Sequence, residues 1–301
     1  MTSPVPPRAF AWTEAHLAAL CGVAEAAGAA ILAIYERVGR AGGEGLAVTR
    51  KGDDSPLTEA DLAADRLIRT RLGELFEGLP VLSEEGDAAS DAAIDPAGGY
   101  FLVDPLDGTK EFLARNGEFT VNIAWVQGGH VTAGVVHVPT LGETYWGAAG
   151  VGAWKAQPPA GAGAGAGADA GFEASAIRPI RVAPLPSPGA TWRVLVSRSH
   201  GGAAQRAYLT RLPAAVQCIE AGSSLKFCRL AEGAADLYPR LSPTMAWDTA
   251  AGQAVLEAAG GVVLGTEGAP LRVPQRVRAA PNPPFVAASS AELARRAAVA
   301  F

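Results

Sequence analysis

Apolar residues recur at helical spacing close to the start of the chain. The stretch between residues 17 and 35 carries a stripe of larger apolar side chains formed by Leu17, Leu20, Ala24, Ala27, Ile31 and Ile34. Its only charge is Glu25, so a membrane span has to be considered, but the stretch is rich in alanine and weakly hydrophobic. We therefore expect a helix that packs against a protein core, and no transmembrane segment.

A second helix and several strands follow. Thr58 can cap a helix whose apolar side is formed by Leu62, Leu67, Ile68 and Leu72. The pieces "VLS" and "YFLV" read as short strands. Segments 119–126, 131–138 and 143–148 are rich in β-branched and aromatic residues and are separated by turns that contain glycine, which predicts antiparallel strands.

The second half of the chain has a different organisation. Residues 157–171 form a low-complexity Gly-Ala tract without a core-forming side chain, which predicts a disordered surface loop. After it, a strand at 192–197 and a helix near 202–212 precede further alternating segments, a pattern typical of a smaller α/β lobe. We expect an N-terminal α+β lobe over 1–185 and a C-terminal lobe over 186–301.

Composition limits the class of protein. The 301 residues are 49% hydrophobic, enough for a substantial core. A formal charge of −5 provides no basic footprint for a nucleic-acid polymer, so an anionic ligand needs a metal ion or placed Lys and Arg residues. Three scattered cysteines and a start that does not resemble a secretory signal favour a reducing, cytoplasmic location.

The segment "LVDPLDGTKEF" places two carboxylates at the end of a predicted strand. Pro105 cannot donate to a sheet hydrogen bond, so we expect the strand to end at Asp104. Gly108 permits a tight turn, and Thr109 can begin a helix whose free N–H groups face the same space as Asp104 and Asp107. This arrangement suits a divalent cation beside a phosphate. The alternative is an Asx-type turn in which Asp107 and Thr109 only cap a helix.

Other acidic residues occur in similar positions. Glu84 and Glu85 follow the short strand "VLS", and Asp248 precedes the predicted helix "TAAGQAVLEAAGG". Each has a structural alternative: the glutamates can be solvated turn residues, and Asp248 can be a carboxylate favoured by the helix dipole. Their joint occurrence favours a metal site.

Seven segments resemble, in order, the inositol-monophosphatase-like family of magnesium-dependent phosphatases: "VLSEE", "LVDPLDGTKEF", "NGEFTVNIA", "SRSH", "GSSLKFC", "LYPR" and "WDTAAG". Within the family they are most similar to the 3′(2′),5′-bisphosphate nucleotidases of the CysQ type, chiefly through "DGTKEF" and "GSSLKFC". The resemblance implies a layered αβαβα phosphatase fold of the α+β class, with the active site between two lobes.

The resemblance also implies a ligand set for two or three Mg²⁺ ions. The matching ligands are Glu84, Asp104, the backbone carbonyl of Leu106, Asp107 and Asp248, and Asp104 would bridge two ions. Thr109, hydrogen-bonded to Asp61, matches the pair that orients and deprotonates the attacking water, and Glu85 is expected to contribute. Asp61 also has a structural interpretation, because it lies three residues after Thr58 and can complete a capping box.

The implied substrate is a small bisphosphorylated nucleotide. 3′-Phosphoadenosine 5′-phosphate would be hydrolysed to AMP, a step that clears a by-product of sulfate assimilation, and lithium would inhibit it. Lys226 can help to cradle the second phosphate and Arg240 can clamp it, although Lys226 also fits the solvated side of an amphipathic helix. The other expected substrate contacts are Gly108, Thr109, Lys110, His200, Gly222, Ser223 and Ser224.

Three other functions remain open. A haloacid-dehalogenase-like phosphatase has a similar Asp-Gly-Thr motif, but its two aspartates are two residues apart, whereas Asp104 and Asp107 are three apart. An inositol or sugar monophosphatase on the same scaffold differs only in substrate. A non-catalytic metal- and nucleotide-binding sensor would keep the pocket without turnover. Oligomeric state, the role of the Gly-Ala tract and peripheral membrane association are left open.

Overall fold

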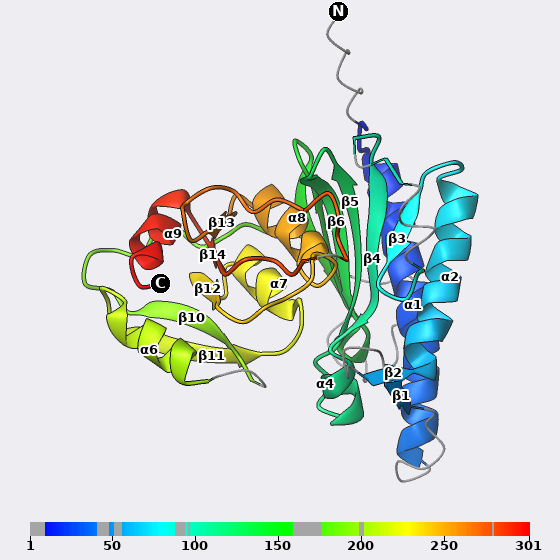
Figure 1. Ribbon diagram of the computed structural model, residues 1–301, viewed down its shortest axis with the longest axis horizontal. Coiled ribbons are helices and arrows are strands. Elements are labelled where there is room, and N and C mark those ends of the chain that lie inside the picture. The colour runs from blue at the N-terminus through cyan, green and yellow to red at the C-terminus, as the bar shows by residue number, and fades with distance from the viewer. Residues whose placement is uncertain are drawn as a thin grey trace, which may run out of the picture.

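The fold has five alternating layers of helices and sheets (Figure 1). We describe it from a computed structural model that covers residues 10–40, 48–50, 56–87, 94–95, 97–158, 176–198, 202–278 and 280–301. From one side to the other, the layers are α1 and α2, a seven-stranded sheet, α7 and α8, a five-stranded sheet, and α6 and α9. The predicted αβαβα architecture is confirmed.

The helices have the following bounds. They are α1 (Glu14–Arg40), α2 (Glu59–Leu75), α4 (Thr109–Leu113), α6 (Ala203–Arg211), α7 (Leu225–Ala231), α8 (Ala250–Ala258) and α9 (Ala291–Ala298), together with the 3₁₀ turn η1 (Pro139–Leu141). The predicted helix near 202–212 corresponds to α6. Thr58 caps α2 as expected, because its side-chain oxygen accepts a hydrogen bond from the N–H of Ala60 at 3.2 Å.

The seven-stranded sheet has the order β3-β4-β5-β6-β7-β8-β9. Its strands are β3 (Val81–Ser83), β4 (Tyr100–Asp107), β5 (Thr120–Gln127), β6 (His130–Val138), β7 (Glu143–Ala148), β8 (Gly152–Gln157) and β9 (Ala176–Pro179). All neighbours are antiparallel except β3 and β4, which are parallel. The three strands predicted as antiparallel from their β-branched and aromatic residues, β5, β6 and β7, are confirmed.

The five-stranded sheet has the order β11-β10-β12-β14-β13 and belongs to the second half of the chain. Its strands are β10 (Trp192–Ser197), β11 (Val216–Ala221), β12 (Leu237–Arg240), β13 (Val262–Gly265) and β14 (Phe285–Ala288). A separate pair, β1 (Val48–Arg50) and β2 (Pro56–Thr58), precedes α2. The change from one sheet to the other falls between 179 and 192, and the lobe boundary at 185 stays a prediction. Most of the Gly-Ala tract, 159–171, lies outside the described residues.

Helix α1 packs against the protein core. By length and composition it could cross a bilayer, and it is the only helix of the described residues for which this is true. Its predicted stripe is nevertheless internal: Leu17, Leu20 and Ile31 are at most 1% exposed and join one cluster with apolar residues of α2, β4, β5 and β6. The prediction of a core helix is therefore confirmed.

The prediction that the strand ends at Asp104 is wrong. Strand β4 continues to Asp107, and the register shifts between Asp104, which pairs with Asn122, and Asp107, which pairs with Thr120. Three steps along β4 therefore face two steps along β5, which is the pattern of a bulge. Pro105 lies inside this irregularity, where a missing N–H donor does not break a regular ladder.

Candidate active site

Three carboxylates from distant parts of the chain meet at the junction of the lobes. Glu84, Asp104 and Asp248 each offer an oxygen, and these oxygens lie within 4.8 Å of one another. β3 and β4 are parallel, so their carboxyl ends lie side by side and bring Glu84 next to Asp104. The N–H of Glu84 donates to the carbonyl of Val103 at 3.0 Å. Asp248 comes from the turn before α8, which packs on the same sheet.

Asp107 lies close to this cluster and is held by the second lobe. Its Oδ2 accepts hydrogen bonds from the backbone N–H of Ser224 at 2.7 Å and from the Ser224 hydroxyl at 2.9 Å. The Ser224 hydroxyl also lies 2.6 Å from the carbonyl of Asp248, and it accepts from Asn122 Nδ2 at 2.9 Å. One serine therefore connects the side chain of Asp107 to the backbone of Asp248.

The electrostatics of these carboxylates suit a bound cation. Burial, followed by the charges of Asp107 and Glu84, raises the pKa of Asp248 well above its ordinary value. Burial also raises the pKa of Asp107, although the ammonium group of Lys226 and the hydrogen bonds from Ser224 oppose this shift. Carboxylate oxygens that repel one another in a partly buried site are the donor set that a hard divalent cation requires. The residues present therefore fit a metal ion.

Thr109 and Asp61 contact each other as the resemblance implies. The Thr109 hydroxyl lies 3.3 Å from Asp61 Oδ1 and 3.4 Å from the carbonyl of Leu106. Asp61 Oδ2 accepts from the N–H of Thr58 at 2.8 Å and from its hydroxyl at 2.6 Å, which completes the capping box of α2. The structural and catalytic interpretations of Asp61 are thus compatible, because each uses a different oxygen of the carboxylate.

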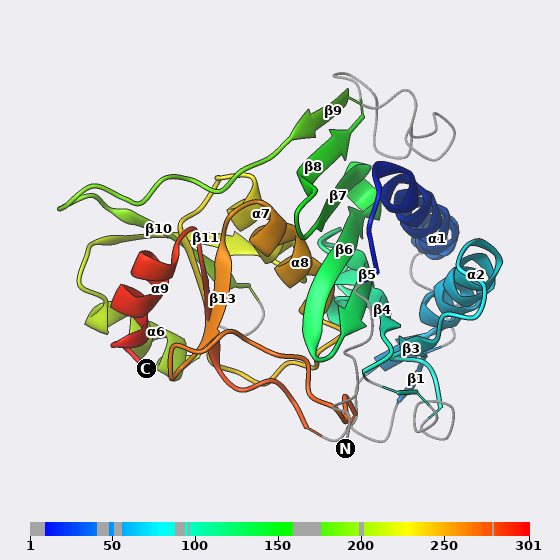
Figure 2. The same cartoon turned by 90° about the horizontal axis from the view of Figure 1, so that it is seen from above.

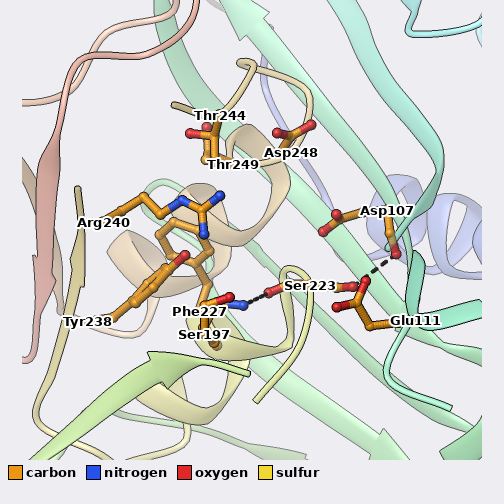
Figure 3. Close-up of a pocket in the computed structure, with 11 residues that line it drawn as sticks. Asp107, Glu111, Ser197, Ser223, Phe227, Tyr238, Arg240, Thr244, Asp248 and Thr249 are labelled. Atoms are coloured by element: carbon orange, nitrogen blue, oxygen red, sulfur yellow. Dashed lines mark hydrogen bonds between the residues drawn. The ribbon is translucent and has the colours of Figure 1, made fainter. Parts of the chain in front are cut away.

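A pocket adjoins the carboxylates. It is lined by Asp107, Glu111, Ser197, Ser223, Lys226, Phe227, Tyr238, Arg240, Thr244, Asp248 and Thr249. Figure 3 shows Asp107 and Asp248 on one side of this space and Arg240 and Tyr238 on the other. A second pocket of about 220 Å³ shares Ser197, Tyr238 and Arg240 with it. The site therefore combines an acidic end with a basic and aromatic end.

Lys226 is buried in the pocket wall, at 3% exposure, so its interpretation as a solvated helix residue is wrong. Its ammonium group donates to the carbonyls of Ser223 at 2.8 Å and Ala221 at 3.2 Å and lies 5.5 Å from the centre of the Tyr238 ring. Burial lowers its pKa to about 8, while Asp107 acts in the opposite direction.

The turn before α7 packs tightly against the turn before α4. The Ser223 hydroxyl lies 3.0 Å from the carbonyl of Asp107 and 2.7 Å from that of Glu118, and Ser223 has a left-handed φ of 44°. Gly108 has a φ of +91°, and a Cβ there would collide with the Ser223 hydroxyl. A Cβ on Gly222 would lie 2.8 Å from the Cβ of Glu118. Gly108 therefore permits close approach of the two turns, and Gly222 permits close approach to the segment before β5.

Some predicted site residues do not join this group. Lys110 is exposed and does not line the pocket, and Glu85 is not part of the three-carboxylate cluster. Arg240 lines both pockets and donates to the carbonyl of Ser242 at 3.2 Å. His200 lies outside the described residues, so its predicted contact stays a prediction.

Sequence reasoning did not single out several lining residues. They are Glu111, Ser197, Phe227, Tyr238, Thr244 and Thr249. Five of them lie within quoted motifs, since "DGTKEF" contains Glu111, "SRSH" contains Ser197, "GSSLKFC" contains Phe227, "LYPR" contains Tyr238 and "WDTAAG" contains Thr249. Thr244 lies in none of the quoted motifs, and only its position in three dimensions distinguishes it from other hydroxyl residues.

The sequence from residue 12 to residue 298 matches the model of the inositol monophosphatase family. The chain belongs to this family. The resemblance found from the sequence motifs is therefore confirmed, including its CysQ-type character. The 3′(2′),5′-bisphosphate nucleotidase CysQ of Escherichia coli strain K12 is 42% identical over 260 residues, which cover 84% of this chain and 91% of the relative. The enzyme of the same name from Haemophilus influenzae is 34% identical and covers 79% of this chain and 82% of its own length.

Solved structures of the family have the same fold. The crystal structure of CysQ from Bacteroides thetaiotaomicron, with 38% sequence identity, superposes with a TM-score of 0.70 over 90% of this chain and 96% of its own. The SuhB protein of Bartonella henselae superposes with a TM-score of 0.69 over 93% of this chain and 96% of its own. Its identity is 22%, so this second likeness concerns the fold alone.

Proposed function

We propose that this protein is a Mg²⁺-dependent phosphatase that hydrolyses the 3′-phosphate of 3′-phosphoadenosine 5′-phosphate to AMP and inorganic phosphate. The observation that carries the proposal is one pocket lined by Asp107 and Asp248, the second of which clusters with Glu84 and Asp104, and also by Arg240 and buried Lys226. The carboxylates suit a divalent cation, and the two basic side chains suit a second phosphate group. The CysQ relatives carry the name of the same activity.

The carboxylates are the proposed ligands of two or three Mg²⁺ ions. The ligand set is Glu84, Asp104, the carbonyl of Leu106, Asp107 and Asp248. When bound there, Mg²⁺ supplies charge neutralisation for the phosphoryl oxygens and lowers the pKa of water. Inhibition by lithium remains an expectation from the family.

Thr109 and Asp61 are the residues that we assign to the attacking water. Hydrolysis breaks the bond between phosphorus and O3′ of the ribose, and water supplies the oxygen that forms the new bond to phosphorus. The Thr109 hydroxyl orients this water, takes its proton and passes its own proton to Asp61, whose Oδ1 lies 3.3 Å away, and the departing O3′ takes up a proton to become the ribose hydroxyl. Glu85 directly follows Glu84 in the sequence and is proposed to assist in activating the water.

The nucleotide is proposed to extend from the carboxylates toward the basic end. Lys226 and Arg240 would neutralise the 5′-phosphate, and Ser223 and Gly222 shape the turn beside it. The neighbouring pocket that shares Tyr238 and Arg240 offers room for the nucleoside. Turnover of a by-product of sulfate assimilation in the cytoplasm is the proposed cellular role.

The test is phosphate release from three substrates, first with Mg²⁺ and then with EDTA. We expect 3′-phosphoadenosine 5′-phosphate to be preferred over inositol 1-phosphate and fructose 1,6-bisphosphate, and EDTA to abolish release. Asp104→Asn should remain folded and lose activity, whereas Asp95→Asn, at an exposed position, should keep it. Preference for inositol 1-phosphate would favour the sugar-phosphatase alternative. A trapped aspartyl-phosphate would favour the haloacid-dehalogenase chemistry. Nucleotide binding without phosphate release would favour the non-catalytic sensor.

A further inference from the structure

Arg278 reaches from the second lobe to the peptide that carries Glu84. It lies in the segment between β13 and β14, which extends toward the seven-stranded sheet in Figure 2. Its Nη1 donates to the carbonyl of Glu84 at 2.9 Å, and its Nη2 donates to the carbonyl of Ser83. The guanidinium therefore donates to two successive carbonyl groups, those of Ser83 and Glu84, which lie 195 and 194 positions away in the sequence.

The same guanidinium contacts the residue before Asp248. Its central carbon lies 5.3 Å from the centre of the Trp247 ring, a distance typical of a cation–π interaction. Trp247 is 7% exposed, so its ring has little freedom to move. Asp248 is anchored in turn by the N–H of Met245, which donates to its Oδ2 at 2.8 Å. The Arg278 side chain thus contacts the backbone of Glu84 and the ring of the residue before Asp248, and so lies next to two of the three clustered carboxylates.

A second arginine lies beside the Glu84 turn. Arg69 of α2 donates its Nε to both oxygens of Asp65 at 3.0 Å and its Nη1 to the carbonyl of Val81 at 3.5 Å. A Cβ added to Gly86 would meet the guanidinium of Arg69 and would lie 3.2 Å from Nη2 of Arg278. One arginine from each lobe therefore approaches this turn at Gly86.

We propose that Arg278 is a positioning residue that fixes the separation of Glu84 and Asp248, and so sets the affinity of the metal site. The inference rests on the proposed function, because it assumes that these carboxylates bind Mg²⁺. Arg278 does not line the substrate pocket. A planar guanidinium donates to two carbonyls and stacks on an indole at the same time, whereas a lysine ammonium cannot reproduce this geometry.

The test compares Arg278→Ala and Arg278→Lys with Arg276→Ala, which removes an exposed arginine from the same segment. The readouts are the Mg²⁺ concentration that gives a fixed increase in melting temperature, the Mg²⁺ concentration for half-maximal activity, and KM for the nucleotide at saturating Mg²⁺. Both Arg278 variants should need about 10–100-fold more Mg²⁺ with little change in nucleotide KM. Arg276→Ala should match the unaltered protein.

The outcomes separate this inference from the proposed function. If the unaltered protein responds to Mg²⁺ and Arg278→Lys needs the same Mg²⁺ concentration, the inference is overturned. A lower melting temperature with an unchanged Mg²⁺ requirement also overturns it, since it would mark a purely structural tie between lobes. If the unaltered protein neither responds to Mg²⁺ nor releases phosphate, the proposed function itself is wrong. Should Arg278→Ala not fold, Arg278→Lys decides alone.

Discussion

The hydroxyl of Thr109 and the carboxylate of Asp61 lie 3.3 Å apart, although 48 residues separate them in the sequence. The other carboxylate oxygen closes the capping box of α2 with Thr58. Because Asp61 is only 2% exposed, its position is fixed by these contacts. The start of α2 therefore holds the group that we assign as proton acceptor, and loss of the cap and loss of the proton acceptor can be tested separately.

Asp61→Asn should lower the rate of phosphate release by about 100-fold or more, the usual scale for loss of a general base. If the amide oxygen of the new side chain faces Thr58, its NH₂ group faces the Thr109 hydroxyl and cannot accept a proton. Thr58→Ala removes the cap and one donor to Asp61 Oδ2 but keeps the backbone N–H donor, so it should cost about 1 kcal/mol of stability and lower kcat far less than Asp61→Asn. Urea unfolding and steady-state kinetics on both variants check this. Equal losses of kcat in the two would contradict it.

Ser224→Ala should weaken Mg²⁺ binding by about tenfold, the lower end of the effect of removing a residue that orients metal ligands. The Ser224 hydroxyl, in a residue 2% exposed, contacts both the Asp107 carboxylate and the Asp248 carbonyl. The melting temperature measured against Mg²⁺ concentration gives the affinity.

A matched control exists for Ser224→Ala. Ser289 is also buried, and its hydroxyl has no hydrogen-bond partner in the part of the chain that the structure describes. Ser289→Ala should therefore leave the Mg²⁺ titration unchanged. An equal shift for both serine variants would show that the effect of Ser224 comes from packing rather than from the orientation of Asp107.

The acidic residues of the site could be singled out from the sequence because each follows a short apolar run or precedes a predicted helix. Glu84 and Asp104 follow short apolar runs, and parallel pairing of β3 with β4 then brings them together. The end of β4 was predicted wrongly. The rule that proline ends a strand does not foresee a bulge, and a bulge depends on the partner strand.

The basic side of the site was harder to predict. Lys226 has the same helical spacing whether it faces solvent or a pocket, and only the packing of α7 between the two sheets decides the matter. Arg278 lies in a segment without strand or helix periodicity, so nothing local distinguishes it from exposed Arg276. Contacts between lobes, which join residues nearly 200 positions apart, leave no periodic pattern in the sequence.

Lys226→Met should reduce kcat/KM for 3′-phosphoadenosine 5′-phosphate by about 10–100-fold, the scale of one lost charge-assisted hydrogen bond. For 3′-AMP, which lacks the 5′-phosphate, the loss should be smaller, because only the support of the Ser223 turn is lost. Lys110→Met, at an exposed position outside the pocket lining, should change neither value much. Kinetics with the two substrates measure the ratio. Equal losses for both would remove Lys226 from 5′-phosphate recognition.

His137 should make the stability of the fold depend on pH. The ring belongs to β6 and is buried against Gly28 of α1. Its Nδ1 lies 3.0 Å from the Thr144 hydroxyl, and that hydroxyl donates to Glu25 at 2.7 Å. The Thr144 hydroxyl has a single proton, so His137 Nδ1 must be the donor in the first contact. Nε2 lies against Gly28 of α1, because a Cβ added to Gly28 would be only 2.6 Å from it. A proton on Nε2 would therefore face α1 instead of water. Burial accordingly lowers the pKa of His137 to about 4.

The pKa of His137 is 6.5 in the unfolded chain, the ordinary value, and about 4 in the folded protein. Between these two pH values the unfolded chain carries a proton on His137 and the folded protein does not. Stability is therefore complete above this range, falls as the pH drops through it, and changes no further below it. The loss between pH 7 and pH 5 is about 2 kcal/mol for this residue. Burial raises the pKa of Glu25, and this shift makes the folded protein more stable as the pH drops. The contribution of His137 is therefore isolated by comparing the protein with a His137 variant. Urea unfolding at both pH values should show a smaller pH effect in His137→Gln by about that amount, and equal pH effects in the two proteins would refute the assignment.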